Sequence, residues 1–335
     1  MRHRNILVIG GTGFVGGHLV AALATDGRRI TVPTRRRESG KRLLLLPTVE
    51  VVPARIADDA TLARLMVGKD AVINLVGILH GDAGRPYGRA FEAAHVDLPR
   101  RIVAACRAAS VPRLLHMSAL GADANGPSMY LRSKAAGEAV VEEAGTVGDG
   151  DRPPLAVTVF RPSVVFGRDD RFLNLFATMQ RWLPAMPLGN ADAQFQPVAV
   201  GDVAAAFVAA LDDAESYSRT YELTGPRVYS LADLVRIAGR YRAGGNGRPR
   251  PVIPLPAALG RLQAALLEFA PGPTLMSRDN VDSMQVANVA TGAFPGLADL
   301  DIVATPLEQE ASVYLADRNR RTHLDQLRHD AHPVE

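Results

Sequence analysis

Three glycines directly after the first apolar segment limit what this chain can fold into more than any other feature. Residues 5–9, NILVI, suit a buried strand, and GGTGFVGGHL follows with a glycine at every third position from residue 10. Such glycines allow a tight turn, close approach of backbone N–H groups to a pyrophosphate, and close packing of the next helix, whose N terminus attracts anions. A turn that serves only close packing is the alternative. The position after a strand favours a dinucleotide site, formed by Gly10, Thr12, Gly13, Phe14, Val15 and Gly16.

The first half of the chain alternates short aliphatic or β-branched runs with segments of helical period. The intervening segments carry apolar residues at helical spacing and end near Gly or before Pro, as helices do. This alternation is typical of a parallel sheet covered by helices on both faces. It predicts an α/β fold, a Rossmann-type doubly wound parallel sheet, with strands near residues 5–10, 29–34, 49–54, 71–77, 113–118 and 155–160.

The second half of the chain is richer in proline and in isolated helical segments, which predicts a smaller, mostly helical substrate or lid domain. Residues 195–211 resemble a return to the sheet domain, with Asp202 as a helix N-cap. We expect the nucleotide-binding domain in residues 1–165 and about 192–228, the lid domain in 166–191 and 229–316, and a polar tail in 317–335.

Composition excludes several classes of protein. No apolar run reaches the roughly 18 residues that a membrane span requires, and the N terminus lacks the pattern of a signal peptide, so we expect a cytoplasmic protein. The single Cys106 fits a reducing compartment. His80, His95 and His116 lack metal-ligand spacing, so no metal site is predicted. The arginines lack interleaved aromatic residues, so no nucleic-acid partner is predicted.

The residues after the second predicted strand bear on the choice of dinucleotide. An acidic residue at this place would hold the 2′-hydroxyl of NAD. The chain instead has Arg35, Arg36 and Arg37, and arginine suits the 2′-phosphate of NADP through charge-assisted contacts. A solvated surface run is the alternative, because 35 of the 38 basic residues are arginine. We expect NADP(H) rather than NAD(H), held at this end by Arg35 and Arg36.

Several motifs together resemble one family. GGTGFVGG, then NLVG after the fourth predicted strand, a serine after the fifth, and Tyr130 four residues before Lys134 are similar to short-chain dehydrogenases/reductases of the extended or atypical kind. More narrowly, NLVGIL, HMSALGA, SMYLRSKAAGE, FRPSVVFG and FQPVAVGDVA resemble the branch of the dinucleotide-binding accessory subunit of respiratory complex I and its bacterial relatives. The resemblance covers roughly residues 4 to 315.

The resemblance implies a reacting pair and further cofactor contacts. Tyr130 would exchange a proton with the substrate oxygen, and Lys134 would bind the nicotinamide ribose. Lowering a tyrosine pKa from about 10 to 7 needs about 4 kcal/mol, which one ammonium about 4 Å away can supply. Spacing of four brings both side chains to one helix face. The remaining contacts with the cofactor that the resemblance implies come from Asn74, Val76, Gly77, Arg161 and Pro162.

Two positions depart from the family pattern. Ser118 aligns with the first residue of the family's serine pair, but Ala119 takes the second place, whose hydroxyl often binds the substrate oxygen. Ser118 remains a candidate catalytic residue if its loop shifts. Arg55 replaces an aspartate that touches the adenine, which leaves Asp58 as the nearby candidate. For Asn74, an organising role at the sheet end and a plain buried amide are both open.

Two functions follow from these observations. The first is an NAD(P)H-binding oxidoreductase with Tyr130 as acid or base, acting on a hydrophobic, quinone-related or isoprenoid substrate. The second is a weakly catalytic or non-catalytic accessory or assembly protein of a membrane NADH:quinone oxidoreductase, with peripheral contact at the inner membrane. The apolar face of residues 255–269 closes the lid core, or else forms a hydrophobic entrance or a membrane-resting patch. Arg168 and Arg171 lie in a solvated loop or meet an acidic substrate group.

Overall fold

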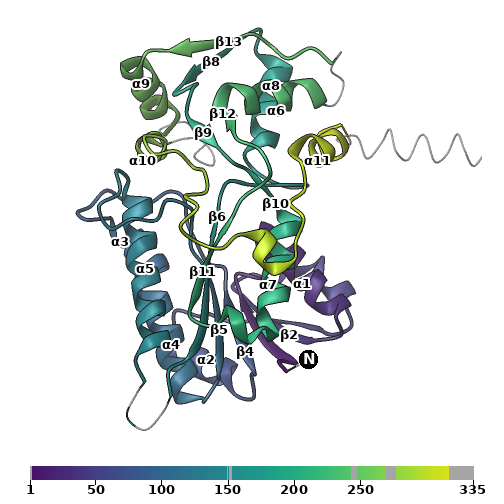
Figure 1. Ribbon diagram of the computed structural model, residues 1–335, viewed down its shortest axis with the longest axis vertical. Helices are drawn as coiled ribbons and strands as arrows, with labels where there is room; N and C mark the ends of the chain where they lie inside the picture. The colour runs from purple at the N-terminus through teal and green to yellow at the C-terminus, as the bar shows by residue number, and fades with distance from the viewer. Residues whose placement is uncertain (1, 149, 151–152, 243–246, 269–276, 317–335) are drawn as a thin grey trace, which may run out of the picture.

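The computed structural model describes residues 2–148, 150, 153–242, 247–268 and 277–316. Seven strands form one sheet in the order β11-β6-β5-β4-β1-β2-β3, and every neighbouring pair is parallel. The predicted α/β fold with a doubly wound parallel sheet is therefore confirmed (Figure 1). The strands are β1 (Asn5–Ile9), β2 (Arg29–Thr34), β3 (Val49–Pro53), β4 (Ala71–Asn74), β5 (Arg113–Met117), β6 (Ala156–Pro162) and β11 (Arg219–Leu223).

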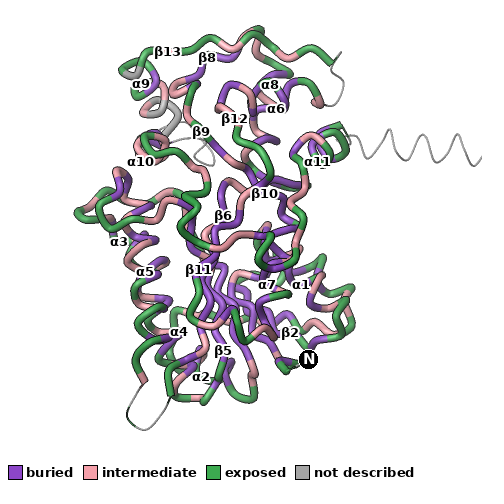
Figure 2. Tube along the Cα trace, in the orientation of Figure 1, coloured by how far each residue is buried: buried purple, intermediate pink, exposed green. Residues whose placement is uncertain are grey.

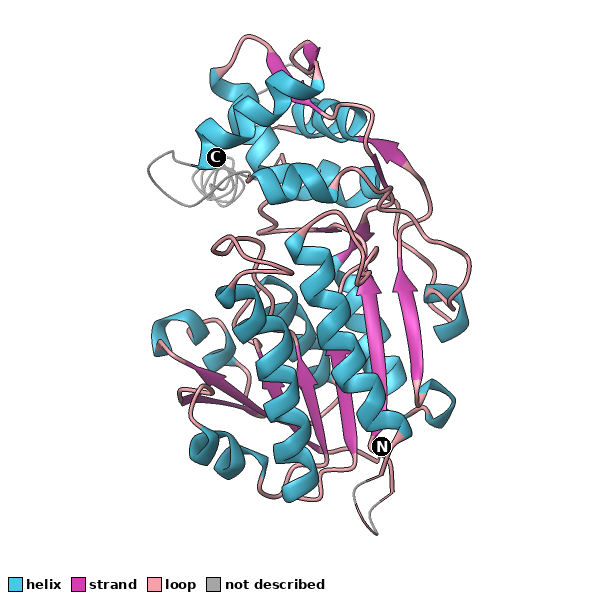
Figure 3. Cartoon of the chain, turned by 90° about the vertical axis from the view of Figure 1, so that its left-hand side faces the viewer, coloured by secondary structure: helices cyan, strands magenta, loops and turns pink. Residues whose placement is uncertain are grey.

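Helices cover both faces of the sheet, as Figure 3 shows for the face turned towards the viewer. Side chains of β1 alternate between two cores: Ile6 and Val8 pack in one, and Leu7 and Ile9 in the other. Both sets are buried, which explains why these strands consist of continuous apolar runs. The first core includes α1 (Phe14–Thr25) and α7 (Val200–Asp212), and the second includes α2 (Asp59–Met66), α4 (Leu98–Ala108) and α5 (Met129–Thr146).

A third core lies beyond the carboxyl ends of the strands, at the top of Figure 1. It joins residues of α6 (Leu173–Trp182), β8 (Met186–Gly189), α8 (Leu231–Tyr241) and α11 (Leu307–Tyr314). Further elements of this region are β7 (Val165–Phe166), β9 (Gln194–Phe195), β10 (Val198–Ala199), β12 (Tyr229–Ser230), β13 (Val252–Leu255), α9 (Ala257–Glu268) and α10 (Arg278–Ser283). Figure 2 shows the sheet as the most deeply buried part of the chain.

The division into two domains remains a proposal. One segment expected in the lid domain packs against the sheet domain instead. Leu297 and Leu300, in the short helix η5 (Leu297–Leu300), pack in the core beside α1 and α7. The polar tail lies outside the described residues. The other short elements are the 3₁₀ helices η1 (Arg37–Gly40), η2 (Leu43–Leu45) and η4 (Ala214–Ser216), the α-helix α3 (Arg89–Glu92) and the π-helix η3 (Ala93–Asp97).

The expectation that Asp202 is a helix N-cap is wrong. Helix α7 begins two residues earlier, at Val200, so Asp202 lies within its first turn. The Asp202 carboxylate instead accepts hydrogen bonds from the Thr305 N–H at 2.7 Å and from the Thr305 hydroxyl at 2.8 Å. The residue therefore ties a distant segment of the chain to α7, a partner that local sequence cannot reveal.

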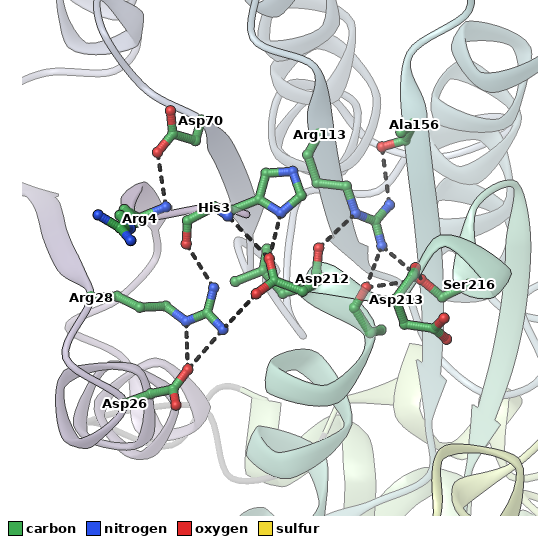
Figure 4. Close-up of polar contacts among 12 residues, drawn as sticks. His3, Arg4, Asp26, Arg28, Asp70, Arg113, Ala156, Asp212, Asp213 and Ser216 are labelled. Atoms are coloured by element: carbon green, nitrogen blue, oxygen red, sulfur yellow. Dashed lines mark hydrogen bonds and ion pairs between the residues drawn. The ribbon is translucent and has the colours of Figure 1, made fainter. Parts of the chain in front are cut away.

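The amino edge of the sheet is held by buried polar contacts, drawn in Figure 4. The Arg113 side chain is fully buried and donates hydrogen bonds to the carbonyl oxygens of Ala156 and Ala210, and to the hydroxyls of Thr158 and Ser216. Burial lowers the Arg113 pKa to about 10, so the group stays charged at neutral pH. Arg113 thus joins β5 and β6 to the C-terminal end of α7.

A second group in Figure 4 is centred on Asp212 at the end of α7. Its carboxylate accepts hydrogen bonds from the His3 N–H at 3.0 Å, from His3 Nδ1 at 2.8 Å and from Arg28 at 3.2 Å. Burial by itself would raise the Asp212 pKa, but these hydrogen bonds outweigh it and hold the pKa well below its usual range. The N-terminal segment is thereby attached to α7.

We predict that Asp212→Asn lowers the free energy of unfolding by about 1 to 2 kcal/mol at pH 7. The folded pKa lies below the unfolded value of about 3.9, so the stabilisation is present above that value and is lost as pH falls. Urea unfolding followed by circular dichroism should show the difference from wild type shrinking from about pH 5 downwards. Glu215→Gln, at an exposed residue, is the control. An equal difference at every pH would contradict the assignment.

Candidate functional site

The glycine turn and the start of α1 form one part of the candidate site. Gly10 has φ of +87°, and a Cβ on Gly16 would lie 2.3 Å from the Gly10 carbonyl oxygen, so the helix packs directly on the turn. Gly13 occupies the N-cap position in extended conformation. Within the described chain no side chain caps α1, and its first turn has no acidic residue. These features fit the pyrophosphate of a dinucleotide, which the free N–H groups would hold.

The remaining residues of the predicted turn differ in how deeply they are buried. Val15 is buried in the core that includes α1, whereas Thr12 and Phe14 are half-buried. The Phe14 ring packs edge-on against His18, with ring centroids 5.8 Å apart. A backbone contact with a cofactor therefore remains the role we predict for Val15, because its side chain is already used in packing.

The two predicted phosphate-binding arginines lie just beyond β2 and are exposed. Thr34 Oγ1 accepts a hydrogen bond from the Arg36 N–H at 3.3 Å and donates one to the Arg36 carbonyl at 2.9 Å, which fixes the backbone of this turn. Neither Arg35 nor Arg36 forms an ion pair with any described residue. Both guanidinium groups are available to an anion.

Part of the Asp58 carboxylate is already used in a structural hydrogen bond. Asp58 is the N-cap of α2, and its carboxylate accepts a hydrogen bond from the Thr61 N–H at 2.8 Å. A hydrogen bond with the Thr61 side chain is the largest cause of a lowered Asp58 pKa, and this backbone bond is the second. The adenine contact predicted for Asp58 can use only the carboxylate oxygen that the cap leaves available.

The end of β4 and the loop after it contact β5 and the lysine of α5. Asn74 is buried, donates a hydrogen bond from Nδ2 to His116 Nδ1 at 3.1 Å, and accepts one from the Val76 N–H at 3.2 Å. Gly77 is exposed, and a Cβ on it would lie 3.1 Å from Lys134 Nζ. Asn74 thus joins two strand ends, and the loop after β4 lies directly against the lysine.

Helix α5 carries the predicted reacting pair. Ser128 caps its N terminus by accepting a hydrogen bond from the Leu131 N–H at 3.1 Å. Lys134 is buried and donates to the Met117 carbonyl oxygen at 3.1 Å, at the end of β5. Burial lowers the Lys134 pKa to about 8, and the Glu138 charge acts in the opposite direction. The ammonium is therefore held at the carboxyl edge of the sheet and remains mostly charged at pH 7.

The Tyr130 ring lies against two aromatic side chains. Its centroid is 6.5 Å from that of Phe91 and 5.7 Å from that of the His95 ring, both edge-on. Burial raises the pKa of Tyr130. From the sequence we expect the Lys134 charge to lower the Tyr130 pKa. The structure shows the opposite direction, because burial removes water from the phenolate and so disfavours it. The phenol is therefore protonated at neutral pH in this structure, as a proton donor must be.

His95 has a larger part in the site than its dispersed position in the sequence suggests. It lies in η3, the π-helical segment, and accepts a hydrogen bond at Nε2 from the Ile78 N–H at 3.0 Å. Its proton is therefore on Nδ1, which donates to Ser133 Oγ at 2.8 Å, and Ser133 donates to the Tyr130 carbonyl at 2.8 Å. Burial, followed by the charge of Lys134, lowers the His95 pKa to about 2. A neutral His95 thus links the loop after β4 to α5.

Ser118 and Arg161 meet Glu138 rather than open space. Arg161 makes a two-point ion pair with Glu138, with Nε–Oε1 of 2.8 Å and Nη2–Oε2 of 2.6 Å. Ser118 Oγ is buried without a hydrogen bond of ordinary geometry. Burial raises the pKa of the Glu138 carboxyl, and Arg161 and, to a smaller extent, the nearby Ser118 hydroxyl act in the opposite direction. Pro162 accepts the Leu120 N–H at 3.0 Å through its carbonyl. The roles predicted for Ser118 and Arg161 remain predictions, since both side chains adjoin a carboxylate.

An element from far along the chain holds the start of α5. The Asp279 carboxylate, in α10, accepts hydrogen bonds from the Met129 N–H at 2.7 Å and the Tyr130 N–H at 3.1 Å. Ser283 donates to the Ser128 hydroxyl at 2.8 Å. Sequence reasoning missed Asp279, because the pattern around it indicates only the start of a helix.

The structure brings Lys134, Gly77 and Asn74 together at the ends of β4 and β5. The Tyr130 ring adjoins this group through His95, whose Nε2 binds the loop after β4. Arg171 is exposed after β7. Among the described residues no group of His, Cys, Asp or Glu has the arrangement of a metal site. In the same part of the chain no helix has the length and apolar character to cross a membrane.

Comparisons with known proteins agree with this geometry. A model of the NAD dependent epimerase/dehydratase family matches residues 6–224. The chain is 32% identical over 322 residues to mouse (Mus musculus) mitochondrial NADH dehydrogenase (ubiquinone) 1 alpha subcomplex subunit 9, covering 94% of this chain and 80% of that protein. It is 32% identical over 204 residues to ceramide reductase of Caulobacter vibrioides, covering 61% of this chain and 60% of that protein. The predicted resemblance is confirmed.

A solved structure supports the fold. The NADPH-dependent quinone oxidoreductase of Escherichia coli, complexed with NADPH, superimposes with a TM-score of 0.70 at 17% identity. The match covers 92% of this chain and 98% of that chain. The likeness shows a shared fold over nearly the whole length.

Two neighbouring glycines provide a matched test of the nucleotide site. We predict that Gly16→Ala weakens dinucleotide binding at least about tenfold, because the new Cβ would force α1 away from the turn. Gly17→Ala is the control, since its Cβ would meet no atom within 4 Å. That control should retain binding and gain up to about 1 kcal/mol of stability. Fluorescence titration with NADPH and NADH, beside thermal unfolding, measures both effects. Equal binding by the two variants would refute the pyrophosphate assignment.

Proposed function

This chain belongs to the NAD dependent epimerase/dehydratase family, and we propose that within it the chain is an NADP(H)-dependent oxidoreductase. The bound nicotinamide would supply or accept a hydride at C4, and the substrate would carry a carbonyl, a hydroxyl or an activated double bond. We further propose that this substrate is hydrophobic, quinone-related or isoprenoid.

The observation that carries the proposal is the position of Tyr130 and Lys134. Their helix places them four residues apart, and Lys134 lies against Gly77 and the end of β5. In the proposed reaction Tyr130 gives a proton to, or takes one from, the substrate oxygen. Lys134 holds a ribose hydroxyl, and its charge favours the phenolate when the tyrosine acts as a base.

The structure also supports a role for His95 in keeping this arrangement. Its hydrogen bonds to Ile78 and Ser133 join the loop after β4 to α5, and its ring packs edge-on against Tyr130. A π-helical segment often marks a functional site, because the extra residue redirects one side chain. We propose that His95 is a positioning residue that stays neutral throughout.

The proposed preference for NADP(H) rests on Arg35 and Arg36. Both are exposed at the carboxyl end of β2, where the second strand of such a fold meets the adenosine ribose. A hydrophobic substrate is supported by the name of the ceramide reductase relative.

A second function is favoured by two specific observations. The mouse relative is named as a subunit of NADH dehydrogenase (ubiquinone). In this chain the Ser118 hydroxyl adjoins Glu138, and Ala119 stands in the second serine place. Together they support a nucleotide-bound accessory or assembly protein of a membrane NADH:quinone oxidoreductase, peripheral at the membrane. In that case the bound nucleotide stabilises the fold without turnover.

We predict that Tyr130→Phe lowers kcat by about 10²-fold or more and leaves NADPH affinity nearly unchanged, because only the proton donor is lost. The measurement is nucleotide oxidation or reduction by the purified protein with a panel of quinone-related and isoprenoid carbonyl compounds. Tyr241→Phe, on α8, should retain wild-type turnover. Undiminished turnover by Tyr130→Phe would exclude the proton-transfer role. Tight nucleotide binding with no turnover of any compound by the wild type would favour the accessory function.

We predict that Arg35→Ala and Arg36→Ala each weaken NADPH binding by about tenfold and change NADH binding little, because only NADPH carries the 2′-phosphate. Calorimetric titration of each variant with both nucleotides measures the difference. Arg64→Ala, at an exposed residue of α2, serves as the control for loss of one positive charge. Equal losses of affinity for NADPH and NADH would contradict the assignment of these arginines to the 2′-phosphate.

A further inference from the structure

The acidic residues of this chain are distributed unevenly. Residues 171–191 and 234–267 contain eight arginines and no aspartate or glutamate. The whole chain has 38 basic and 35 acidic residues, so the remaining positions hold 30 basic and 35 acidic ones. Two segments with a charge of +8 therefore belong to a protein whose remainder is negative. The eight are Arg171, Arg181, Arg236, Arg240, Arg242, Arg248, Arg250 and Arg261.

The two acid-free segments come together in the folded chain. Strand β8 from the first pairs in parallel with β13 from the second, and α6 and α8 share one core. The Arg250 N–H donates to Gln180 Oε1 at 2.9 Å, so Arg250 lies beside the end of α6. Figure 1 shows β8 and β13 at the end of the molecule farthest from the amino edge of the sheet. The positive charge is thus collected at one end.

Several of these arginines are not neutralised by an ion pair with a described residue. Arg236 pairs with Asp233 and Arg261 with Asp282. By contrast, Arg181, Arg242 and Arg250 form no ion pair with any described residue. Burial lowers the Arg242 pKa, and the nearby positive charge of Arg250 lowers it further. Like charges this close favour an anionic partner.

Exposed apolar side chains accompany the charge. Trp182, the only tryptophan of the chain, is 83% exposed at the end of α6, and Ile253 on β13 is 50% exposed. Together Arg181, Trp182, Arg242, Arg250 and Ile253 make up what we call the basic tip. Tryptophan beside arginine suits the boundary between lipid headgroups and acyl chains, where the ring is half-buried and the guanidinium meets phosphate. Single-stranded nucleic acid would instead need several stacking rings.

We propose that the basic tip docks this protein on an anionic phospholipid surface. The inference goes beyond the redox function, since it holds whether or not the chain catalyses a reaction. Attraction to an anionic surface is worth about fivefold in partitioning for each arginine near it, and it is screened by salt. Insertion of Trp182 adds an apolar contribution that salt does not weaken.

The test is flotation of the purified full chain with lipid vesicles. We expect binding to vesicles of phosphatidylcholine with about 30 mol% phosphatidylglycerol at about 0.1 M salt, and little binding to phosphatidylcholine alone. The double variant Arg181→Gln with Arg250→Gln should bind about 25-fold more weakly. Trp182→Ser should also bind more weakly. Its binding should still weaken as the salt concentration rises, because the arginines remain.

A matched variant separates the basic tip from net charge. Arg4→Gln with Arg29→Gln removes the same two charges at exposed residues of the opposite edge, and it should bind like the wild type. Equal loss by both double variants would mean that net charge alone acts, and would overturn the proposal. Binding to neutral and anionic vesicles alike would do the same. Stronger binding to RNA or DNA than to anionic vesicles at one salt concentration, lost with Arg181 and Arg250, would assign the basic tip to nucleic acid instead.

Discussion

All seven strands of the central sheet run parallel, so each of them ends at the same edge. Chain order reverses between β1 and β4, and at such a switch point the connecting loops diverge and leave room for a ligand. The glycine turn follows β1, and Asn74 closes β4. The opposite edge carries structural polar groups such as Arg113 and Asp212. This separation lets binding groups remain partly unsatisfied without weakening the scaffold.

The fold was accessible from sequence because its signals are local. Buried parallel strands are continuous apolar runs, and the glycine spacing at residues 10–16 depends only on the next turn and helix. Contacts between distant segments were not accessible. Asp202 binds Thr305, and Asp279 binds the first turn of α5, yet nothing near either aspartate indicates its partner. The π-helical turn that carries His95 also lacks a recognisable sequence pattern.

The site shows how burial and charge are balanced along one helix. Tyr130, Lys134 and Glu138 follow one another at intervals of four on α5, and Arg161 closes the series from β6. Burial disfavours every charged form in this series: it raises the pKa values of Tyr130 and Glu138 and lowers that of Lys134. Alternating charges offset that cost, since each ion has an opposite charge one turn or one strand away. The charged form of Lys134 is therefore favoured by Glu138, a residue outside the proposed reacting pair.

The hydrogen bonds from the first turn of α5 to Asp279 affect how this helix can unfold locally. The first N–H groups of a helix normally fray, and they exchange with solvent hydrogen quickly. Here two of them, at Met129 and Tyr130, are bonded to a carboxylate in α10. Opening this end of α5 must therefore break the contact with α10 as well, so the two helices form one cooperative unit. Tyr130, the proposed proton donor, thereby takes its rigidity from a segment that is about 150 positions away along the chain.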